Sequence, residues 1–587
     1  MTQATPLNRR RFVQGVAAAG AAASAWPLHR AFAVSREPVL TGTEFQLEIG
    51  PMPLNITGRP RIATAINGQI PAPVLRWPEG DTLTLAVTNR LAEPTSIHWH
   101  GVRTPSPMDG VPGLSFAGIP PGQTFVYRFP VHQSGTYWYH SHSAFQEQTG
   151  VYGPIIIEPK GGYAHPFDRD YVVFLSDWSD EQPDTIVSNL KFQSDYYNFH
   201  QRTLGTFIDD VNRQGVFDTA ADRLMWGEMR MSPTDILDVS GATYTYLMNG
   251  KPPASNWTAL FRPGERVRLR FINGSSMSIF DVRIPDLPLT VVQSDGNDVV
   301  PVTVDEFRIG TAETYDVIVQ PQEARAYTIF AQAEDRTGFA RGTLAPRPGL
   351  TTAIPPMDPR PMRTMKDMGM QHGMGAMQMD HGSVPGMSHG ATGGMPLMNH
   401  GSMAHEAMLP KAGMTEQEAA AKLEGSVGVD NVAMMPTERL NEPGEGFPQD
   451  RRVLRYTDLR ALKVGNDPRP PGREIVLHLT GNMERFMWGF DGKKFSEAGP
   501  IELKRGERVR FTLINDTMME HPMHLHGLWS ELENGHGEYR PYKHTIIVKP
   551  GERLSFLVNA DEPGRWAFHC HLLYHMEAGM FREVRVL

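Results

Sequence analysis

The feature that most constrains the fold is one strand pattern that occurs three times in this chain of 587 residues. Each copy starts with Gly and an acidic residue, continues with apolar residues at every second position, and stops at Asn. The copies are residues 80–89, 264–273 and 506–515. Apolar residues with a period of two are typical of a half-buried β-strand. One copy is weak evidence, but three copies with the same start and stop indicate three related β-domains.

A second pattern repeats in the first and last of these regions. Gly135 and Gly564 each lie five residues before a histidine, His140 and His569, in stretches where aromatic and small residues alternate. The chain has 56 glycines and 48 prolines, a turn-rich composition that favours sheets over helices. We therefore predict an all-β protein of three Greek-key β-sandwich or barrel domains, at residues 34–160, 161–345 and 450–587.

The N-terminus has the layout of an export signal. Three arginines at residues 9–11 precede Phe12, an Ala- and Gly-rich apolar stretch follows, and residues 31–33 form a small-residue cleavage pattern. The arginines resemble a twin-arginine signal, which implies export to the periplasm. A disordered basic tail or a membrane anchor is the alternative, but the apolar stretch is shorter than the roughly 20 residues that span a bilayer. We predict a signal peptide at residues 1–33 and no membrane span in the mature protein.

Histidines are concentrated in the first and third predicted domains, where they form four His-x-His pairs. Because residues i and i+2 of a strand project from the same face, each pair can direct two imidazoles at one place. The single cysteine of the chain, Cys570, lies inside the last pair. The pairs are His98 with His100, His140 with His142, His524 with His526, and His569 with His571.

The strand repeat puts two of these pairs in matching positions. His98 and His524 each lie nine residues past the final Asn of their strand copy, and the same offset in the second domain holds Val282. The second histidine of each pair lies eleven residues past the Asn, and that offset in the second domain holds Ile284. Ordinary surface or core histidines explain one such pair, because short motifs match by chance, but they explain four pairs poorly. We predict a cluster of eight imidazoles shared by the first and third domains.

The type of ligand indicates which metal this set suits. Zinc sites usually close at four nitrogen or sulfur ligands, so the set is too large for one zinc ion. A thiolate with two imidazoles and a weak axial thioether is the ligand set of blue-copper electron-transfer sites. His521, Cys570, His575 and Met580 fit that description. Cys570 is also bonded on each side to a histidine of the cluster, which provides a short covalent path for an electron.

Four motifs taken together resemble the copper motifs of the multicopper oxidases. The twin-arginine signal, the Met-rich segment before the last domain and the C-terminal motif further resemble the bacterial copper-resistance oxidases of the CopA type. The motifs are His98-Trp99-His100-Gly101, His140-Ser141-His142, His521-Pro522-Met523-His524-Leu525-His526-Gly527, and His569-Cys570-His571 followed by His575 and Met580.

The resemblance implies three cupredoxin-like domains and four copper ions. It assigns the type 1 copper to His521, Cys570, His575 and Met580. It assigns the type 2 copper to His98 and His524. The remaining six histidines would hold the binuclear type 3 copper: His100, His140, His142, His526, His569 and His571.

The implied reaction is the one-electron oxidation of a donor, Cu(I) or a phenol, coupled to the four-electron reduction of dioxygen to water. Because water formation consumes protons, a carboxylate near the cluster is needed. Asp109 stands where the family keeps an acidic residue near the type 2 copper, although Asp109-Gly110 is also a common turn pair. Some relatives place a second acid directly after the last type 1 histidine. That position is Met576 here, so Glu577, one residue later, is a weak candidate for a proton relay.

Residues 346–449 form a predicted linker, with 14 methionines between Met357 and Met414 and no strand or helix period. Such a stretch cannot bury a core, and we expect it to be disordered. Thioethers and imidazoles are ligands for Cu(I), so the linker could bind further, weakly held Cu(I) for delivery to the type 1 site. The alternative is a solvated linker with adaptable methionines. A Met-x-His-Gly unit recurs at Met370 with His372, Met379 with His381, Met387 with His389, and Met398 with His400.

These observations favour a periplasmic cuprous oxidase for copper tolerance, whose partners would be dioxygen, Cu(I) or phenolic donors, and other periplasmic copper-handling proteins. A net charge of −9 argues against a nucleic-acid partner. Two alternatives stay open. One is a laccase-like phenol oxidase whose Met-rich segment is a spectator. The other is a copper-sequestering protein whose oxidase centre is incidental.

Overall fold

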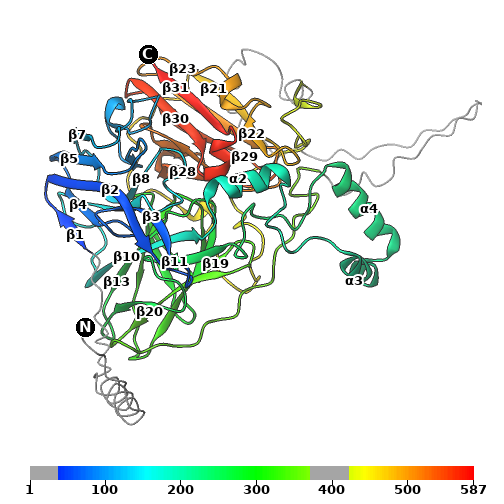
Figure 1. The fold of residues 1–587 in the computed structure, drawn as a ribbon, viewed down its shortest axis with the longest axis horizontal. Helices are drawn as coiled ribbons and strands as arrows, with labels where there is room; N and C mark the ends of the chain where they lie inside the picture. Colours follow the sequence, from blue (N-terminus) through cyan, green and yellow to red (C-terminus); the bar gives the residue numbers. More distant parts are fainter. Residues whose placement is uncertain (1–37, 371–421) are drawn as a thin grey trace, which may run out of the picture.

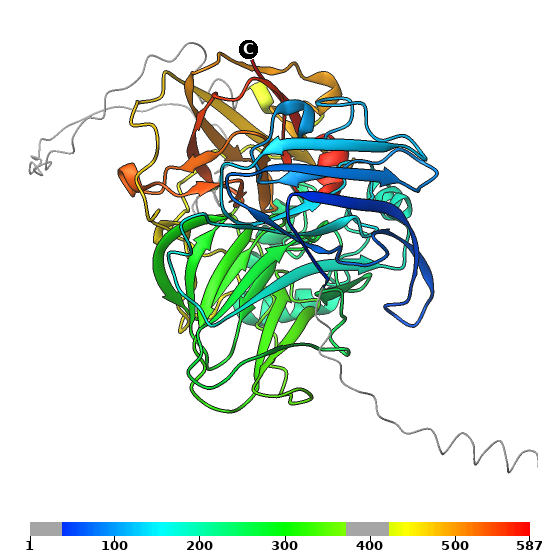
Figure 2. The ribbon, with the colours of Figure 1, turned by 90° about the vertical axis from the view of Figure 1, so that its left-hand side faces the viewer.

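The computed structural model describes residues 38–370 and 422–587. These residues form three β-sandwiches of two sheets each, as the alternating pattern predicts (Figures 1 and 2). The predicted signal peptide lies outside the described residues. Within the described part of the chain, no helix has both the length and the apolar character needed to cross a membrane.

The first sandwich contains nine strands and one short 3-10 helix, η1 (Ser106–Met108). The strands are β1 (Val39–Thr41), β2 (Glu44–Leu54), β3 (Arg61–Ile66), β4 (Val74–Pro78), β5 (Thr82–Asn89), β6 (His98–His100), β7 (Thr124–Pro130), β8 (Gly135–His140) and β9 (Tyr152–Glu158). One sheet has the order β3-β2-β5-β7 and the other β1-β4-β9-β8-β6, so the histidine strand β6 is an edge strand.

The second sandwich contains eleven strands, in sheets of order β11-β10-β13-β18-β15-β16 and β12-β20-β19-β14-β17. They are β10 (Arg169–Ser179), β11 (Tyr244–Met248), β12 (Trp257–Leu260), β13 (Val267–Asn273), β14 (Phe280–Arg283), β15 (Leu289–Ser294), β16 (Asn297–Val304), β17 (Glu306–Ile309), β18 (Thr314–Val319), β19 (Tyr327–Ala333) and β20 (Phe339–Ala345).

The third sandwich repeats this plan, with sheets of order β22-β21-β24-β29-β26-β27 and β23-β31-β30-β25-β28. Its strands are β21 (Arg473–Asn482), β22 (Met487–Phe490), β23 (Ile501–Leu503), β24 (Arg508–Asn515), β25 (His521–Leu525), β26 (Ser530–Leu532), β27 (Tyr542–Lys543), β28 (Thr545–Val548), β29 (Arg553–Asn559), β30 (Gly564–Cys570) and β31 (Phe581–Val586). Its helices are η2 (Tyr456–Asp458), η3 (Phe495–Glu497), η4 (Gly537–Tyr539) and α6 (Leu573–Glu577).

The Asn that ends each strand copy has the same structural role in all three sandwiches. Asn89, Asn273 and Asn515 end β5, β13 and β24, and all three are fully buried. Each side-chain amide donates hydrogen bonds of 2.7–3.0 Å to two backbone carbonyls, one a few residues further along and one on a more distant segment. A buried amide must be paired in this way. The bonds fix the loops that lead into β6, β14 and β25, the strands that hold or replace the histidine pairs.

Three helices between β10 and β11 are the main difference from the all-β prediction. They are α2 (Pro183–Phe192), α3 (Leu204–Gln214) and α4 (Val216–Glu228), and α3 and α4 project from the body at the right of Figure 1. α2 packs through the buried Ile186 and Leu190. The strand repeats carry no information about an insertion of this kind.

The two flanks of the Met-rich linker are packed against the sandwiches. Its composition predicts no buried residues after Met357, whereas Met365 and Met368 belong to the apolar core that is continuous between the second and third sandwiches. Arg363 is also buried and forms an ion pair with Glu334 at 3.0 Å. The prediction is therefore wrong for this flank, because these side chains fill the interface between two sandwiches. Residues 371–421 lie outside the described residues.

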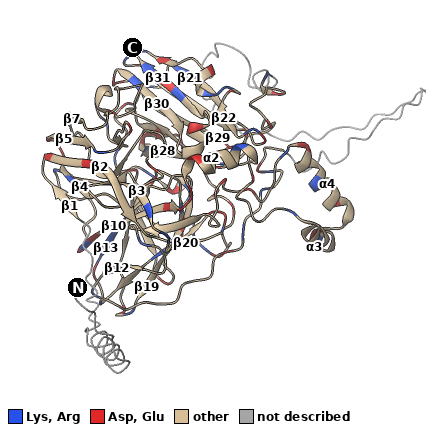
Figure 3. Ribbon diagram, viewed as in Figure 1, with Lys and Arg blue, Asp and Glu red and all other residues tan. Residues whose placement is uncertain are grey.

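Charged residues of both signs are interspersed on the same elements (Figure 3). On β31, for example, Glu583 lies between two arginines and pairs with Arg585 and, from β30, Arg565. This arrangement agrees with the small negative net charge of the chain.

Candidate metal centre

The four His-x-His pairs meet at the junction of the first and third sandwiches. In the first sandwich, β6 pairs with β8 so that His98 faces His140. In the third, β25 pairs with β30 so that His524 faces His569. The two sheets thereby bring all eight predicted imidazoles into one buried cluster, in which the rings contact one another.

One group within the cluster presents three ring nitrogens without partners. His100, His140 and His571 have ligand atoms that all lie within 4.8 Å of one another. Among the described residues, nothing forms a hydrogen bond with His100 Nδ1, His140 Nε2 or His571 Nε2, although all three atoms are buried. Buried polar atoms are normally paired. Three converging imidazole lone pairs suit a metal ion.

A second group consists of His142, His526 and His569, again with ligand atoms within 4.8 Å of one another. The Nε2 atoms of His526 and His569 are 3.0 Å apart, and those of His142 and His569 are 3.4 Å apart. The Nδ1–H of His569 donates to the carbonyl of Cys570, and that of His526 to Asp109 Oδ2. With Nδ1 protonated, both rings have their Nε2 lone pairs free for a metal.

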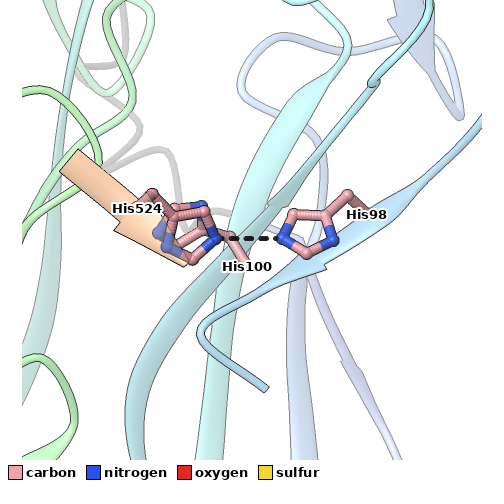
Figure 4. A group of neighbouring side chains, drawn as sticks. All are labelled: His98, His100 and His524. Atoms are coloured by element: carbon pink, nitrogen blue, oxygen red, sulfur yellow. Dashed lines mark hydrogen bonds between the residues drawn. The ribbon is translucent and has the colours of Figure 1, made fainter. Parts of the chain in front are cut away.

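His98 and His524 face each other across the junction, with Nε2 atoms 3.4 Å apart (Figure 4). The Nδ1–H of His98 donates to the carbonyl of Asp109 at 2.7 Å, and the Nδ1–H of His524 donates to the carbonyl of His544 at 2.6 Å. Both rings are therefore held by the backbone with Nε2 turned toward the gap between them.

Burial keeps these imidazoles neutral. For seven of them, burial is the largest cause of a lowered pKa, and the neighbouring histidines add to it. Burial lowers the pKa of His569 to about 4. The pKa is also far below its usual range for His100, His140, His142, His524, His526 and His571. A neutral imidazole is the form that binds a metal.

A separate buried group surrounds the single cysteine. Cys570 Sγ lies 3.5 Å from Nδ1 of His521 and 3.8 Å from Nδ1 of His575, and the two Nδ1 atoms are 3.3 Å apart. Met580 is fully buried, and its backbone bonds both Cys570 and His575. Burial raises the pKa of the Cys570 thiol. A metal would favour the thiolate that burial alone opposes.

Three multicopper oxidase family models match residues 48–162, 169–354 and 468–587. The chain belongs to the multicopper oxidase family. It is 56% identical to Copper resistance protein A of Pseudomonas syringae pv. tomato and also 56% identical to Copper resistance protein A of Escherichia coli, and each match covers 99% of both chains. Among solved structures it resembles Fet3p, a multicopper oxidase that functions in iron import, with a TM-score of 0.62 and 19% identity over 93% of this chain and 90% of Fet3p. The laccase from Botrytis aclada gives 0.60 and 21% over 94% and 89%. These two structures share the fold.

As a multicopper oxidase, the protein is an oxidoreductase that uses copper and dioxygen, and its buried donor set fits copper. Imidazole suits copper in either oxidation state and a thiolate favours the cuprous form. The unpartnered nitrogens of the His100 group and the tautomers of His98 and His524 leave lone pairs free for a metal ion.

Two carboxylates touch the histidine cluster of the multicopper oxidase. Asp109, predicted from its position, is buried and accepts from His526 Nδ1 at 2.9 Å. Glu147, which the motifs did not reveal, lies 2.6 Å from His140 Nδ1 and 4.0 Å from His571 Nδ1. Burial raises the pKa of Glu147 well above its usual value. Glu577 is exposed at the end of α6, so Glu147 is better placed than Glu577 for a proton relay to the cluster.

Other residues around the cysteine group also escaped the motifs. Asp238 Oδ2, from the second sandwich, lies 2.6 Å from His575 Nε2. Thr517 Oγ1 lies 2.7 Å from His521 Nε2, and Trp488 stacks on the His575 ring with centroids 3.8 Å apart. Asp238 is far from His575 in sequence, which is why no spacing pattern pointed to it.

The Met-x-His-Gly units lie almost entirely beyond the described residues. Met370 is the one member that the structure places, partly buried against the apolar core. The other predicted Cu(I)-capture residues fall within 371–421, outside the described residues: His372, Met379, His381, Met387, His389, Met398 and His400.

Proposed function

We propose that this multicopper oxidase is a periplasmic cuprous oxidase that serves copper resistance. Its substrate is Cu(I), and its electron acceptor is dioxygen, which is reduced to water. Two relatives that match it over nearly their whole length are named Copper resistance protein A. The export-signal pattern at residues 1–33 supports the periplasm as its location.

The observation that carries this proposal is where the two ends of the Met-rich segment are attached. On one flank, Arg363 Nε donates to the carbonyl of Met518 at 3.0 Å. On the other, Asn431 and Ala433 donate to Asp516 at 3.0 and 2.9 Å. Residues 516–518 lead directly into His521. Both flanks of the Met-rich segment are therefore bound to the stretch that precedes His521.

The two flanks also contact each other, since Met435 N–H donates to the carbonyl of Gly369 at 3.0 Å. A loop with both ends at one place keeps its Met and His ligands at a high effective concentration there. Cuprous ions bound by thioethers and imidazoles of residues 371–421 would thus be held close to the electron-entry site.

The residues that would hold the cofactors follow the groups described above. His521, Cys570, His575 and Met580 would hold the type 1 copper, and His98 and His524 the type 2 copper. The His100 group and the His142 group would each hold one copper of the type 3 pair. When bound, the four coppers would supply electron transfer and the reduction of dioxygen.

The chain itself orients the donors and moves protons. Asp238 accepts from His575 Nε2 and so directs Nδ1 toward Cys570. Cys570 is bonded to both His569 and His571, which connects the two groups of ligands through the backbone. Each Cu(I) gives up one electron, and one dioxygen takes up four electrons and four protons to become two waters. Asp109 and Glu147, in contact with cluster histidines, are placed to hold those protons.

A groove between the first and third sandwiches supports a route for dioxygen and water. It has a volume of about 320 Å³, and Arg103 and Trp529 contribute to its lining. The same two residues line a small cavity together with His98, His524 and His526. Arg103 and Trp529 thus line both the groove and the cavity beside the buried cluster.

The test replaces Met and His by Leu and Gln in three units of the segment, at Met379, His381, Met387, His389, Met398 and His400. The kcat/KM for Cu(I) should fall about tenfold or more, because local capture is lost, while phenol oxidation should change by less than about twofold. A matched control changes Ser388 and Asn399, which lie inside the same units, to Ala and should leave both rates as they were.

Two results would favour other functions. Unchanged turnover of Cu(I) would contradict the proposal and favour a laccase-like phenol oxidase with a spectator segment. If cells carrying Cys570→Ser tolerate copper as well as cells carrying the natural chain, copper sequestration would be the better account, since the oxidase site would then be dispensable.

A further inference from the structure

His544 is a buried histidine inside the cluster that the copper motifs leave out. Its ring contacts the ring of His100 edge-on, with centroids 4.7 Å apart. His544 Nδ1 lies 3.1 Å from His100 Nε2, and Thr545 Oγ1 lies 3.2 Å from the same His100 atom. His544 Nδ1 and Thr545 Oγ1 are 3.1 Å apart, so the three atoms form one network.

The network offers hydrogen-bond partners to one nitrogen of His100, Nε2. His100 Nδ1 is one of the three unpartnered nitrogens that converge with His140 and His571. A neutral imidazole has one N–H and one lone pair. If Nδ1 offers its lone pair to a metal, the proton is on Nε2, where His544 Nδ1 and Thr545 Oγ1 are the acceptors within reach.

Residue 544 also fixes a second cluster histidine, but through its backbone. Its carbonyl accepts the Nδ1–H of His524 at 2.6 Å, which leaves His524 Nε2 facing His98. A change of the His544 side chain therefore acts on His100 and spares the bond to His524. This separation makes the side-chain role testable.

The second sandwich holds this segment in place. Asp295 Oδ2 accepts the backbone N–H groups of His544 at 3.1 Å and Thr545 at 3.2 Å, and it pairs with Lys543 Nζ at 3.0 Å. All of these groups are buried. Gly101 gives the ring its space, because a Cβ there would lie 2.4 Å from His544 Cδ2. The position of His544 is thus set from all three sandwiches.

We propose that His544 is a positioning residue of the histidine cluster: with Thr545 it holds His100 as the Nε2–H tautomer and so presents His100 Nδ1 to the metal position shared with His140 and His571. His544 itself is not a ligand in this arrangement. The proposal rests on the ligand assignment of the proposed function, but not on the identity of the electron donor.

The test measures copper retention in the holoenzyme. His544→Phe keeps a ring but removes one acceptor, and His544→Phe with Thr545→Val removes both. After dialysis against a chelator, the double variant should lose the copper of the histidine cluster about 10–100-fold faster than the unaltered protein, the usual effect of losing a partner of a metal-bound histidine. The blue absorbance of the Cys570 site should be unchanged. His544→Gln, whose amide oxygen can accept from His100 Nε2, should restore retention to within about threefold of the unaltered protein.

Equal copper retention in the double variant would overturn the proposal, as would failure of His544→Gln to exceed His544→Phe. If the double variant does not fold, shown by loss of the blue absorbance, Thr545→Val alone and His544→Phe alone decide the question. Each should then show a smaller increase in copper loss, and no increase in either would overturn the proposal. Copper retention is measured without a donor, so a failed cuprous-oxidase test leaves this result unaffected.

Discussion

The second sandwich has the strand framework of the first and third but none of the predicted copper ligands. β14 is the counterpart of β6 and β25, and it follows the same buried Asn. Where they carry histidines, β14 carries Val282, which is fully buried and aligned with Phe307 on β17 and Ala331 on β19. The strand framework therefore forms without the ligands.

The second sandwich acts on the metal groups in a different way. It supplies carboxylates that contact the outer side of the site: Asp238 reaches His575, and Asp295 holds the segment of His544. Outer partners of this kind orient metal-bound histidines and tune the metal. From this comparison we expect the largest loss of copper binding and activity when a ligand of the first or third sandwich is replaced. Changing a carboxylate of the second sandwich should have a smaller effect.

The largest effect is expected for Cys570→Ser. The change removes the thiolate of the proposed type 1 set, although the backbone link from residue 570 to His569 and His571 remains. Oxidation of every donor should be abolished and the blue absorbance lost, while copper in the histidine cluster is retained. Stopped-flow oxidation and copper analysis test this. Measurable donor oxidation by this variant would show that electrons enter elsewhere.

The metal-free protein should lose stability as the pH falls from about 6.5 to about 4. Burial lowers the pKa of His569 to about 4, whereas an unfolded histidine titrates near 6.5. In that interval the unfolded chain binds a proton that the folded chain does not, so the free energy of unfolding decreases, by on the order of 3 kcal/mol for this residue. Urea unfolding at several pH values measures it. His569→Gln should reduce the slope, and an unchanged slope would mean that His569 does not contribute to it.

Val282→His tests whether the middle sandwich can take an outer-sandwich ligand. An imidazole there would be buried among apolar side chains, without the five histidines whose rings surround His98. The free energy of unfolding should fall by about 2–4 kcal/mol, from lost packing and an unpaired polar ring, with no gain of copper. Val282→Ala separates the packing loss from the polar cost. An additional tightly bound copper would show that the framework alone builds a site.

Asp238→Asn should have an intermediate effect on the Cys570 site. The variant keeps the shape of the side chain but removes the anionic acceptor of His575 Nε2, and the affinity for type 1 copper should fall about 10–100-fold. The type 1 reduction potential should rise, because a less basic imidazole stabilises the oxidised site less. Redox titration of the blue absorbance measures this. Asp286→Asn, an exposed residue of the same sandwich, is the control. Equal reduction potentials in the two variants would show that Asp238 does not influence the Cys570 site.

The strand framework and the ligand groups were predictable because they leave a local signature. Period-two alternation and the final Asn identify β5, β13 and β24, and the i, i+2 spacing of the histidines places pairs on one strand face. The repeat register then related His98 to His524 without any structural information. These features depend on residues close together in the chain.

The rest depends on contacts between distant segments. Asp238, Asp295 and Glu147 are ordinary acidic residues in sequence and gain their meaning from histidines on other strands or sandwiches. The helices α2–α4 interrupt no repeat, and the burial of Met365 follows from an interface that composition does not encode. Sequence patterns report local geometry well and interdomain packing poorly.

The smallest effect is expected for Glu577→Gln, which separates a carboxylate near the ligands in sequence from one that touches them in space. Glu577 follows His575, a ligand of the proposed type 1 copper, by two residues but is exposed, so its loss should change the rate of dioxygen reduction by less than about twofold, as for an ordinary surface substitution. Glu147→Gln, at a buried carboxylate 2.6 Å from His140 Nδ1, should slow the same step by more. Steady-state oxygen consumption across pH compares the two. A larger effect at Glu577 would mean that protons reach the cluster past α6, and the carboxylates in contact with the histidines would then not be the ones that matter.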